Sequence, residues 1–260
     1  MLRTLECDLP STDSVLERER AYHEKLYSGF AQKHFARPAV RAFREHLAKR
    51  ILHLTEAGRS SRVLSLGCGI GDTELLLAPH IAEVVGLDLS PSAVRQARAD
   101  AELLSFRNVT FVEGTEPDAG DRFDVIIAIF LLHHLPDEIL FALPVRLGAM
   151  LNPGGVFYSL DPSIRRLSGA IGRRLIPNMM KKYQSPDERE LDPRATAELF
   201  RGAGFQVRSE MYDFGSTPFA GLFPAWRLGY RAVRAADDFL LRVSALKRVG
   251  SNFEIIATRP

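Results

Sequence analysis

The chain has 260 residues and a formal net charge of only +2, with 46% hydrophobic and 25% charged residues. These values are ordinary for a globular protein and exclude a disordered, collagen-like or low-complexity chain. Its two cysteines, Cys7 and Cys68, are too few for a disulfide framework or a cysteine zinc site. The longest strongly apolar run, 125–132, is far too short to span a bilayer, and the first residues lack the apolar region of a secretory signal. We therefore expect a cytoplasmic protein of one large or two small domains.

Basic residues are concentrated in two segments of the chain. Segment 164–183 contains six Arg or Lys residues and no acidic residue, and segment 222–248 contains six against two Asp residues. Such asymmetry indicates an anionic partner more strongly than the total charge does. Two solvated helix faces would explain the same pattern, so both interpretations stay open.

The first part of the chain has a helical pattern. Segment 14–57 is typical of two helices, with Pro38 at the start of the second and Gly58 at its end. We expect 1–58 to form an N-terminal helical cap.

From residue 59 onward, strands and helices alternate. Strands are predicted at 62–66, 83–88, 109–112, 123–129, 155–160, 205–212 and 252–258. Helices are predicted at 72–78, 91–104, from 136 onward and at 193–203, and Ser90 and Pro91 provide the cap and first position of the second of these. The alternation predicts an α/β fold with a doubly wound, mostly parallel sheet whose last two strands can form an antiparallel edge.

Two regions interrupt this alternation. We expect 59–260 to be one domain with helical lid insertions at about 162–192 and 213–250, which together contain the two basic segments. Insertions of this kind lie above the carboxyl edge of the sheet, where ligands bind in such folds.

A glycine-rich turn follows the first predicted strand. Gly67, Gly69 and Gly71 permit positive φ and a close approach of backbone to ligand. The dinucleotide fingerprint G-x-G-x-x-G would place its third glycine at position 72, but here the third glycine is Gly71 and position 72 is Asp. A carboxylate at that position would repel a pyrophosphate. The turn therefore argues against an NAD-dependent oxidoreductase. Asp88 ends the second strand, where it can accept hydrogen bonds from ribose hydroxyls or cap the following helix.

Four segments together resemble the successive motifs of class I S-adenosylmethionine-dependent methyltransferases. They are VLSLGCGIGDTELLLA, VVGLDLSPSAVRQAR, FDVIIAIFLLHHLPD and LNPGGVFYSLDPS, and they cover about residues 60–161. The resemblance implies a seven-stranded sheet of order 3-2-1-4-5-7-6 with strand 7 antiparallel. It also implies S-adenosylmethionine as methyl donor and S-adenosylhomocysteine as product.

The resemblance further assigns cofactor contacts at matched positions. The backbone of the turn would lie along the methionine part, with Asp72 near its ammonium group, while Asp88 would bind the ribose and Leu89 the adenine. The usual acidic residue after the third strand is replaced here by Thr115. The implied cofactor-binding residues are Gly67, Cys68, Gly69, Gly71, Asp72, Asp88, Leu89, Gly114, Thr115 and Ile129.

The acceptor side is expected over the fourth strand and the loop after it. The sequence at 128–131 is AIFL, not the [D/N]-P-P-[Y/F] of enzymes that methylate base amino groups. The following HHLPD resembles small-molecule methyltransferases, including quinone C-methyltransferases and natural-product sugar O-methyltransferases. This resemblance implies His133 as general base, with His134 as second candidate and Asp161 as the orienting carboxylate. Alternatively, the histidines pack against or cap the helix near Pro136. No metal site is expected, because adjacent histidines do not easily share one ion and no third ligand is evident.

Aromatic and basic residues mark two candidate lids. Tyr27 or Phe30 could contact the cofactor, or could belong to a stripe packed on the domain. A helix predicted to begin at Pro224 would place Arg227, Arg231 and Arg234 on one face. Such a helix can lie on an anionic membrane, can cover a pocket for an anionic amphiphile, or can be a structural lid with a solvated basic face.

Together these features predict methyl transfer to an oxygen or carbon of a small or lipid-like acceptor, including an anionic one. Nucleic acid is disfavoured as a partner, although the basic segments keep an RNA methyltransferase as an alternative. A protein that binds the cofactor without catalysis is a second alternative. Peripheral contact with an anionic membrane is compatible with the expected cytoplasmic location, and nothing in the sequence indicates an oligomeric state.

Overall fold

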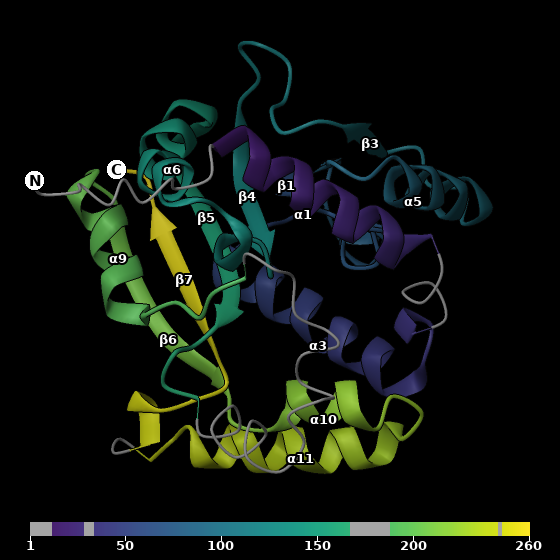
Figure 1. The fold of residues 1–260 in the computed structure, drawn as a ribbon, viewed down its shortest axis with the longest axis vertical. Helices are drawn as coiled ribbons and strands as arrows, with labels where there is room; N and C mark the ends of the chain where they lie inside the picture. The colour runs from purple at the N-terminus through teal and green to yellow at the C-terminus, as the bar shows by residue number, and fades with distance from the viewer. Residues whose placement is uncertain (1–11, 29–33, 167–187, 244–245) are drawn as a thin grey trace, which may run out of the picture.

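The computed structural model describes residues 12–28, 34–166, 188–243 and 246–260, and its strands form one seven-stranded sheet (Figure 1). The strands are β1 Arg62–Leu66, β2 Glu83–Asp88, β3 Val109–Glu113, β4 Phe123–Ile129, β5 Leu151–Pro162, β6 Gln206–Asp213 and β7 Asn252–Thr258. Their order is β3-β2-β1-β4-β5-β7-β6, and β7 is antiparallel to β5 and β6. The predicted α/β fold, strand order and antiparallel edge are therefore confirmed.

The helices follow the local signals of the sequence closely. They are α1 Thr12–Tyr27, α3 Pro38–Thr55, α4 Glu74–Leu77, α5 Pro91–Leu103, α6 Asp137–Met150, α9 Pro193–Gly202, α10 Ser216–Leu222 and α11 Arg227–Leu240. The Ser90 side chain caps α5 by accepting a hydrogen bond from the Ala93 backbone N–H at 3.2 Å, as predicted. The helix predicted at 72–78 is shorter, because a 3₁₀ turn over Ala78–His80 contains Pro79, which lacks a backbone donor.

Strand β4 shows how the core is divided between the two faces of the sheet. Ile126 and Ala128 pack into the cluster under α6 and α9, whereas Val125 and Ile127 pack into the cluster under α3. Side chains alternate across a strand, so an unbroken apolar run must face two covered sides. The continuous apolar run that the sequence shows is thus buried on both faces.

Helix α1 lies along the carboxyl edge of the sheet. Its Glu24 accepts hydrogen bonds from the Ser90 hydroxyl at 2.6 Å and from the Ser92 backbone N–H at 3.1 Å, at the start of α5. Its Arg20 pairs with Glu113 at the end of β3, at 2.6 Å. These contacts place the helix over the ends of the strands, in the position where a ligand would bind.

Helices α10 and α11 follow β6 and pack against α3 (Figure 1). The helix predicted from Pro224 begins at Arg227, and of the three arginines predicted on one face, Arg227 and Arg231 are exposed whereas Arg234 is not. Arg234 is buried and donates to the Tyr212 carbonyl at 3.0 Å, because it lies with Tyr230 and Asp237 on the side of α11 that faces the protein. Most of the first basic segment and Phe30 lie outside the described residues.

An ion pair between a half-buried arginine and a fully buried carboxylate joins α3 to the antiparallel edge of the sheet. The Arg50 guanidinium donates to both carboxylate oxygens of Glu254, with Nε–Oε1 at 2.7 Å and Nη2–Oε2 at 2.6 Å. Glu254 is fully buried and also accepts a hydrogen bond from the Tyr158 hydroxyl. The pair therefore fixes α3 against β7.

We expect Arg50→Leu to lower the free energy of unfolding by about 3–5 kcal/mol, because it leaves an uncompensated buried carboxylate. Replacing Glu254 by Leu in the same chain should recover most of that loss, since the two apolar side chains can pack together. Chemical denaturation measures both variants, with Lys49→Leu on the exposed side of α3 as control. Equal losses in the single and double variants would contradict this account.

Candidate active site

The glycine-rich turn is shaped by both backbone conformation and space. Gly67, Gly69 and Gly71 have φ of 65°, 54° and 74°. A Cβ at Gly71 would lie 2.5 Å from the Phe111 ring, and one at Gly69 would lie 2.6 Å from the Tyr27 hydroxyl. The turn therefore requires glycine at these positions, and it exposes backbone where side chains would otherwise stand.

Asp88 links the turn to the end of β2. Its Oδ2 accepts a hydrogen bond from the Gly69 N–H and its Oδ1 accepts one from the Ser90 N–H, both at 2.8 Å. Burial raises the pKa of the carboxyl group, and the two backbone N–H groups oppose that effect. The cap-like contact with Ser90 is thus present, and the carboxylate retains lone pairs for further donors.

A cavity of about 590 Å³ opens at the carboxyl edge of the sheet. Nine of the predicted cofactor residues line it: Gly67, Cys68, Gly69, Asp72, Asp88, Leu89, Gly114, Thr115 and Ile129. The tenth, Gly71, is absent from the lining and lies instead against Phe111 and Ala97. The sequence motifs therefore converge on one concave site.

An arginine that the sequence did not single out meets the acidic end of the turn. Arg44 of α3 approaches Asp72, with Nε and Oδ2 3.0 Å apart, and both residues line the cavity. Deeper in the wall, Glu74 accepts a hydrogen bond from the Ser65 hydroxyl at 2.6 Å. Burial raises the pKa of Glu74 to about 7, so this carboxyl group is partly neutral near physiological pH.

The predicted pairing of His133 with Asp161 is present. His133 Nδ1 lies 2.9 Å from Asp161 Oδ1, and the His133 backbone N–H donates to the same oxygen at 3.2 Å. Both residues are buried, and neither is among the residues that line the cavity. Asp161 therefore holds the 3₁₀ turn Leu132–His134 to the end of β5.

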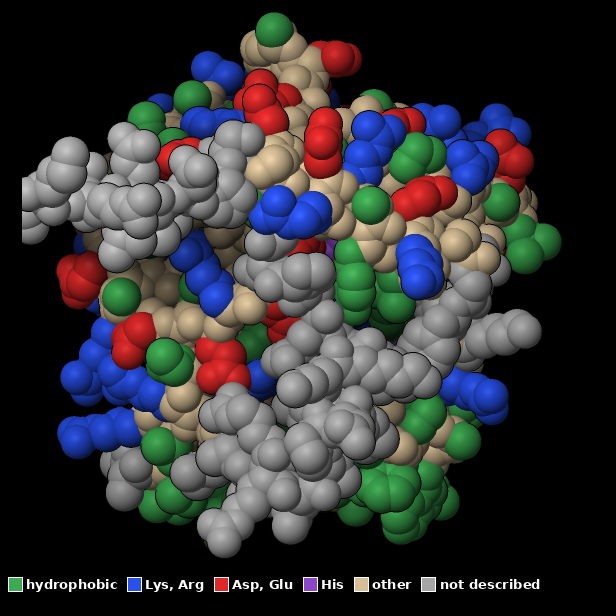
Figure 2. All heavy atoms as spheres, viewed as in Figure 1, with side chains coloured by type: hydrophobic (Ala, Val, Ile, Leu, Met, Phe, Trp, Pro, Cys, Tyr) green, Lys and Arg blue, Asp and Glu red, His purple; other side chains and the backbone are tan. Residues whose placement is uncertain are grey.

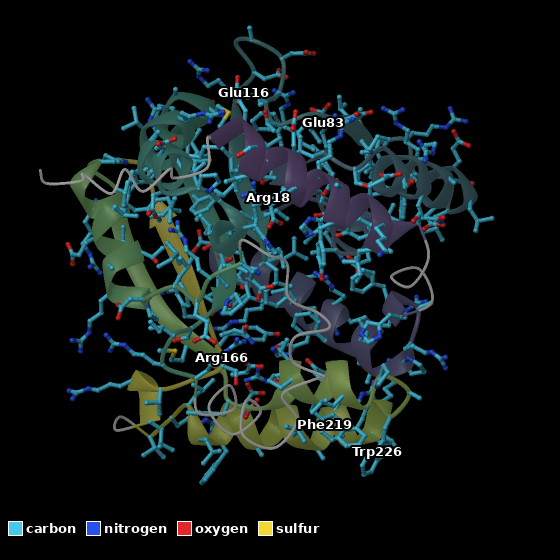
Figure 3. All side chains as sticks on the ribbon, viewed as in Figure 1. Arg18, Glu83, Glu116, Arg166, Phe219 and Trp226 are labelled. Carbon is cyan, nitrogen blue, oxygen red and sulfur yellow. The ribbon has the colours of Figure 1, made fainter. Side chains whose placement is uncertain are left out.

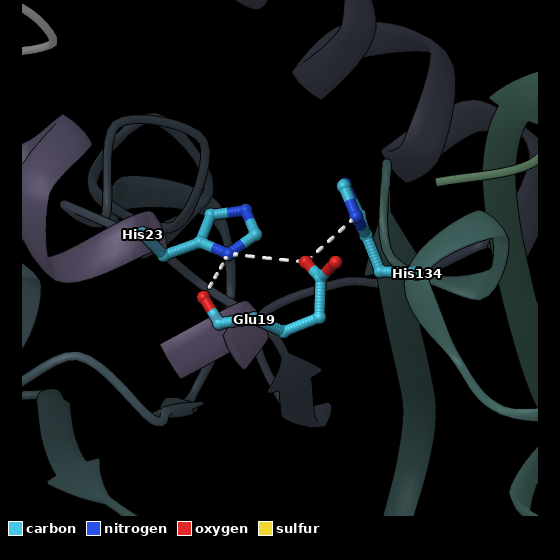
Figure 4. A group of neighbouring side chains, drawn as sticks. All are labelled: Glu19, His23 and His134. Atoms are coloured by element: carbon cyan, nitrogen blue, oxygen red, sulfur yellow. Dashed lines mark hydrogen bonds and ion pairs between the residues drawn. The ribbon is translucent and has the colours of Figure 1, made fainter. Parts of the chain in front are cut away.

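His134 lies in the cavity wall and meets α1 (Figure 4). Its Nδ1 is 3.0 Å from Glu19 Oε2, and His23 Nδ1 is 3.5 Å from the same oxygen and 2.9 Å from the Glu19 carbonyl. Burial and the neighbouring His134 lower the pKa of His23. Glu19 and His23 were not predicted as site residues, although their spacing of four residues places them on one face of a helix.

Glu19, His23 and His134 also offer a potential metal site. One ligand atom of each lies within 4.8 Å of the others. Glu19 is thus the third ligand that was not evident in the sequence. The Glu19 carboxylate already forms ion pairs with both histidines, so the absence of a metal stays a prediction.

Tyr27 completes the wall between α1 and the turn. Its hydroxyl faces Gly69, and burial raises the pKa of the phenol. Hydrogen bonds from Ser90 and Ser92 lower the pKa of Glu24, one turn earlier on α1, to about 2. The helix is therefore held over the cavity by a carboxylate that is ionised at neutral pH.

Comparison with known proteins agrees with this geometry. A family model described as a methyltransferase domain matches residues 34–210. A ubiquinone biosynthesis O-methyltransferase from Azorhizobium caulinodans is 29% identical over 173 residues, which cover 64% of this chain and 66% of that protein. The uncharacterized methyltransferase YcgJ from Bacillus subtilis is 32% identical over 90 residues, which cover 34% and 36%. The matched segments thus span less than two thirds of either relative.

Solved structures share the fold at lower identity. The magnesium protoporphyrin IX methyltransferase of Synechocystis PCC 6803, solved with bound SAH, has a TM-score of 0.58 at 16% identity, covering 96% of each chain. The [4+2]-cyclase SpnF has a TM-score of 0.57 at 19% identity, covering 83% of this chain and 81% of that one. These likenesses show the fold alone. The family model covers more than half of the chain, and the chain therefore belongs to the class I S-adenosylmethionine-dependent methyltransferases.

Proposed function

We propose that the protein transfers the methyl group of S-adenosylmethionine to an oxygen or carbon of a small, largely apolar acceptor. The observation that carries the proposal is one cavity whose wall contains both the glycine-rich turn with Asp88 and His134 with its carboxylate partner Glu19. The O-methyltransferase among the relatives favours a hydroxyl group as the methylated position. Aliphatic side chains elsewhere in the wall, including Leu135, Ile139 and Leu143, favour an apolar acceptor body.

The residues present fit the methyl donor. Glycines without side chains leave backbone open to the ligand, and Asp88 offers lone pairs to two ribose hydroxyls. Asp72 carries a negative charge beside the turn for the ammonium group, with Arg44 orienting it. The bound donor supplies a methyl group already activated for in-line displacement, so the chain chiefly has to align the two reactants.

His134 is proposed as the group that accepts the acceptor's proton. Glu19 engages Nδ1, and a carboxylate there stabilises the imidazolium that forms when Nε2 takes a proton. His133 is proposed as a positioning residue, because Asp161 binds both its ring and its backbone N–H outside the cavity lining. The proposed base is therefore His134, the second candidate from the sequence, and not His133.

Turnover is tested with the purified full chain, labelled S-adenosylmethionine and a panel of hydroxylated aromatics that carry apolar tails. We expect label in the acceptor and formation of S-adenosylhomocysteine in equal amounts. A cofactor that binds without transfer to any acceptor would support the non-catalytic alternative. Transfer to RNA in preference to the small molecules would support the alternative of an RNA methyltransferase.

The Asp88→Asn variant is expected to weaken binding of S-adenosylhomocysteine about 10- to 100-fold, since the ribose hydroxyls lose a charged acceptor. Isothermal titration calorimetry measures the affinity, and circular dichroism checks the fold. The matched control is Asp118→Asn, which changes an exposed Asp outside the cavity lining. Equal affinities in wild type and Asp88→Asn would refute the ribose placement.

The His134→Ala variant is expected to lower kcat about 10²- to 10⁴-fold for a hydroxyl acceptor while leaving cofactor affinity within a factor of about two. His133→Ala should instead lower the melting temperature clearly and reduce kcat less than His134→Ala does, because it leaves its partner Asp161 buried without the imidazole. His53→Ala, on the exposed side of α3, is the surface control.

A chelator distinguishes the two chemistries that the histidine cluster allows. Proton transfer by His134 needs no ion, so kcat should be unchanged after metal removal. If removal abolished activity and Zn²⁺ restored it, His134 would be a ligand, together with Glu19 and His23 or with His133 and Glu188, and its assignment as base would be wrong.

A further inference from the structure

Helix α11 exposes apolar side chains that a water-facing helix ordinarily buries. We define the α11 outer face as Leu228, Ala232, Ala235, Phe239 and Val243, which recur at helical spacing and are all exposed. Leu228 is 72% exposed and Phe239 is 66% exposed. A surface helix of a globular domain turns its apolar stripe toward the core. This helix instead turns a mixed side inward, with Tyr230 beside Arg234 and Asp237, and leaves the outer face exposed.

Buried polar contacts fix that rotation. Arg234 is 6% exposed and Asp237 is 3% exposed, on the side that faces the protein. Asp237 accepts a hydrogen bond from the Ser216 N–H at 2.8 Å, and Arg234 donates to the Tyr212 carbonyl at 3.0 Å. Turning the outer face inward would break these contacts and leave buried polar groups without partners. The outward apolar face is therefore a property of the folded chain.

A tryptophan extends this surface at the start of the helix. Trp226 is 58% exposed, and Figure 3 places it at the outer end of the α10–α11 pair. Its ring lies 5.6 Å from the Phe219 ring, and a Cβ at Gly229 would come within 2.6 Å of it. The ring is thus held in place while exposed. Hydrophobic side chains gather at this end of the molecule in Figure 2, where Leu222 and Phe223 are also exposed.

Basic residues flank the outer face along one edge. Arg227, Arg231 and Arg242 are exposed there, and Asp238 on the same edge pairs with the buried Arg234 at 2.8 Å. Arg227 reaches Glu45 of α3 at 3.0 Å. An apolar face with Trp and Phe, bordered by arginines, is the composition of helices that lie in the interface of an anionic bilayer.

The same surface adjoins the cavity. Thr217, Ala220 and Gly221 of α10 line the cavity wall, and the next two residues, Leu222 and Phe223, are exposed beside Trp226. One short helix therefore reaches from the candidate active site to the apolar surface. No helix among the described residues is long and apolar enough to cross a bilayer, so contact through this surface would be peripheral.

We propose that α10 and α11 dock on an anionic bilayer, with Trp226 and the α11 outer face in the interface, and that an apolar acceptor enters the cavity along α10. The docking is inferred from the exposed residues of α10 and α11 alone, whereas the entry route rests on the proposed function. The arginines supply affinity for negative headgroups, and the apolar side chains supply insertion.

Co-sedimentation of the full chain with vesicles tests the docking. We expect binding to phosphatidylcholine vesicles that contain phosphatidylglycerol and much weaker binding to phosphatidylcholine alone. The double variant Leu228→Glu/Phe239→Glu should bind at least about tenfold more weakly. Arg231→Gln and Arg242→Gln should each weaken binding to the anionic vesicles about fivefold. Leu103→Glu on α5, where the leucine is 81% exposed, is the matched control and should bind like the wild type.

Three outcomes would overturn the proposal: no binding to either vesicle, equal loss in the Leu103→Glu control, or a concentration-dependent dimer that Leu228→Glu dissociates. The last outcome would assign the face to a second copy of the chain. Activity on a short-tailed, water-soluble acceptor should survive the outer-face variants. The binding assay needs no turnover, so a failure of the proposed methyl transfer would be visible separately.

Discussion

The hydrogen bond from the Gly69 N–H to Asp88 is the contact on which the site depends. It joins the turn after β1 to the end of β2, and the Cys68 N–H donates to the Leu87 carbonyl at 2.9 Å beside it. Positive φ and the missing side chains at Gly67, Gly69 and Gly71 then let the turn lie close against Leu131, Tyr27 and Phe111, respectively. Because the carboxylate accepts two backbone N–H groups while it faces the cavity, one side chain both shapes the cradle and presents a charge to the ligand.

The second half of the site comes from outside the methyltransferase motifs. Glu19 and Glu24 lie on α1, and they contact the turn with His134 and the start of α5. Phe130, between β4 and that turn, has a φ of 56°, a backbone conformation that bulky residues rarely adopt. The strained residue redirects the chain so that His133 points to Asp161 and His134 to the cavity. Strain of this kind is typical of sites where placement of a side chain matters more than local stability.

The fold was predictable from the sequence because its signals are local. The continuous apolar run of β4, the Ser90 cap and the prolines at helix starts each depend on a few neighbouring residues. The cofactor side was predictable for a related reason, since the turn and Asp88 sit at strand ends that a parallel sheet brings together. The pairing of His134 with Glu19 and of Asp72 with Arg44 was not, because each depends on how a helix outside the alternation crosses the sheet. The spacing of residues within the motifs does not predict where these helices cross the sheet.

Helix α11 shows a different limit of sequence patterns. Its residues separate clearly into an apolar side and a polar side, and amphipathic periodicity predicts that the apolar side faces the core. The reverse orientation arises because Asp213, at the end of β6, accepts hydrogen bonds from Ser216 and Thr217 and so fixes the start of α10. The N–H groups of Gly215 and Ser216 then turn toward Asp237, which draws the polar side of α11 inward. This buried hydrogen-bond network and the packing of Tyr230 in the core together set the rotation of α11, and they leave its apolar stripe exposed.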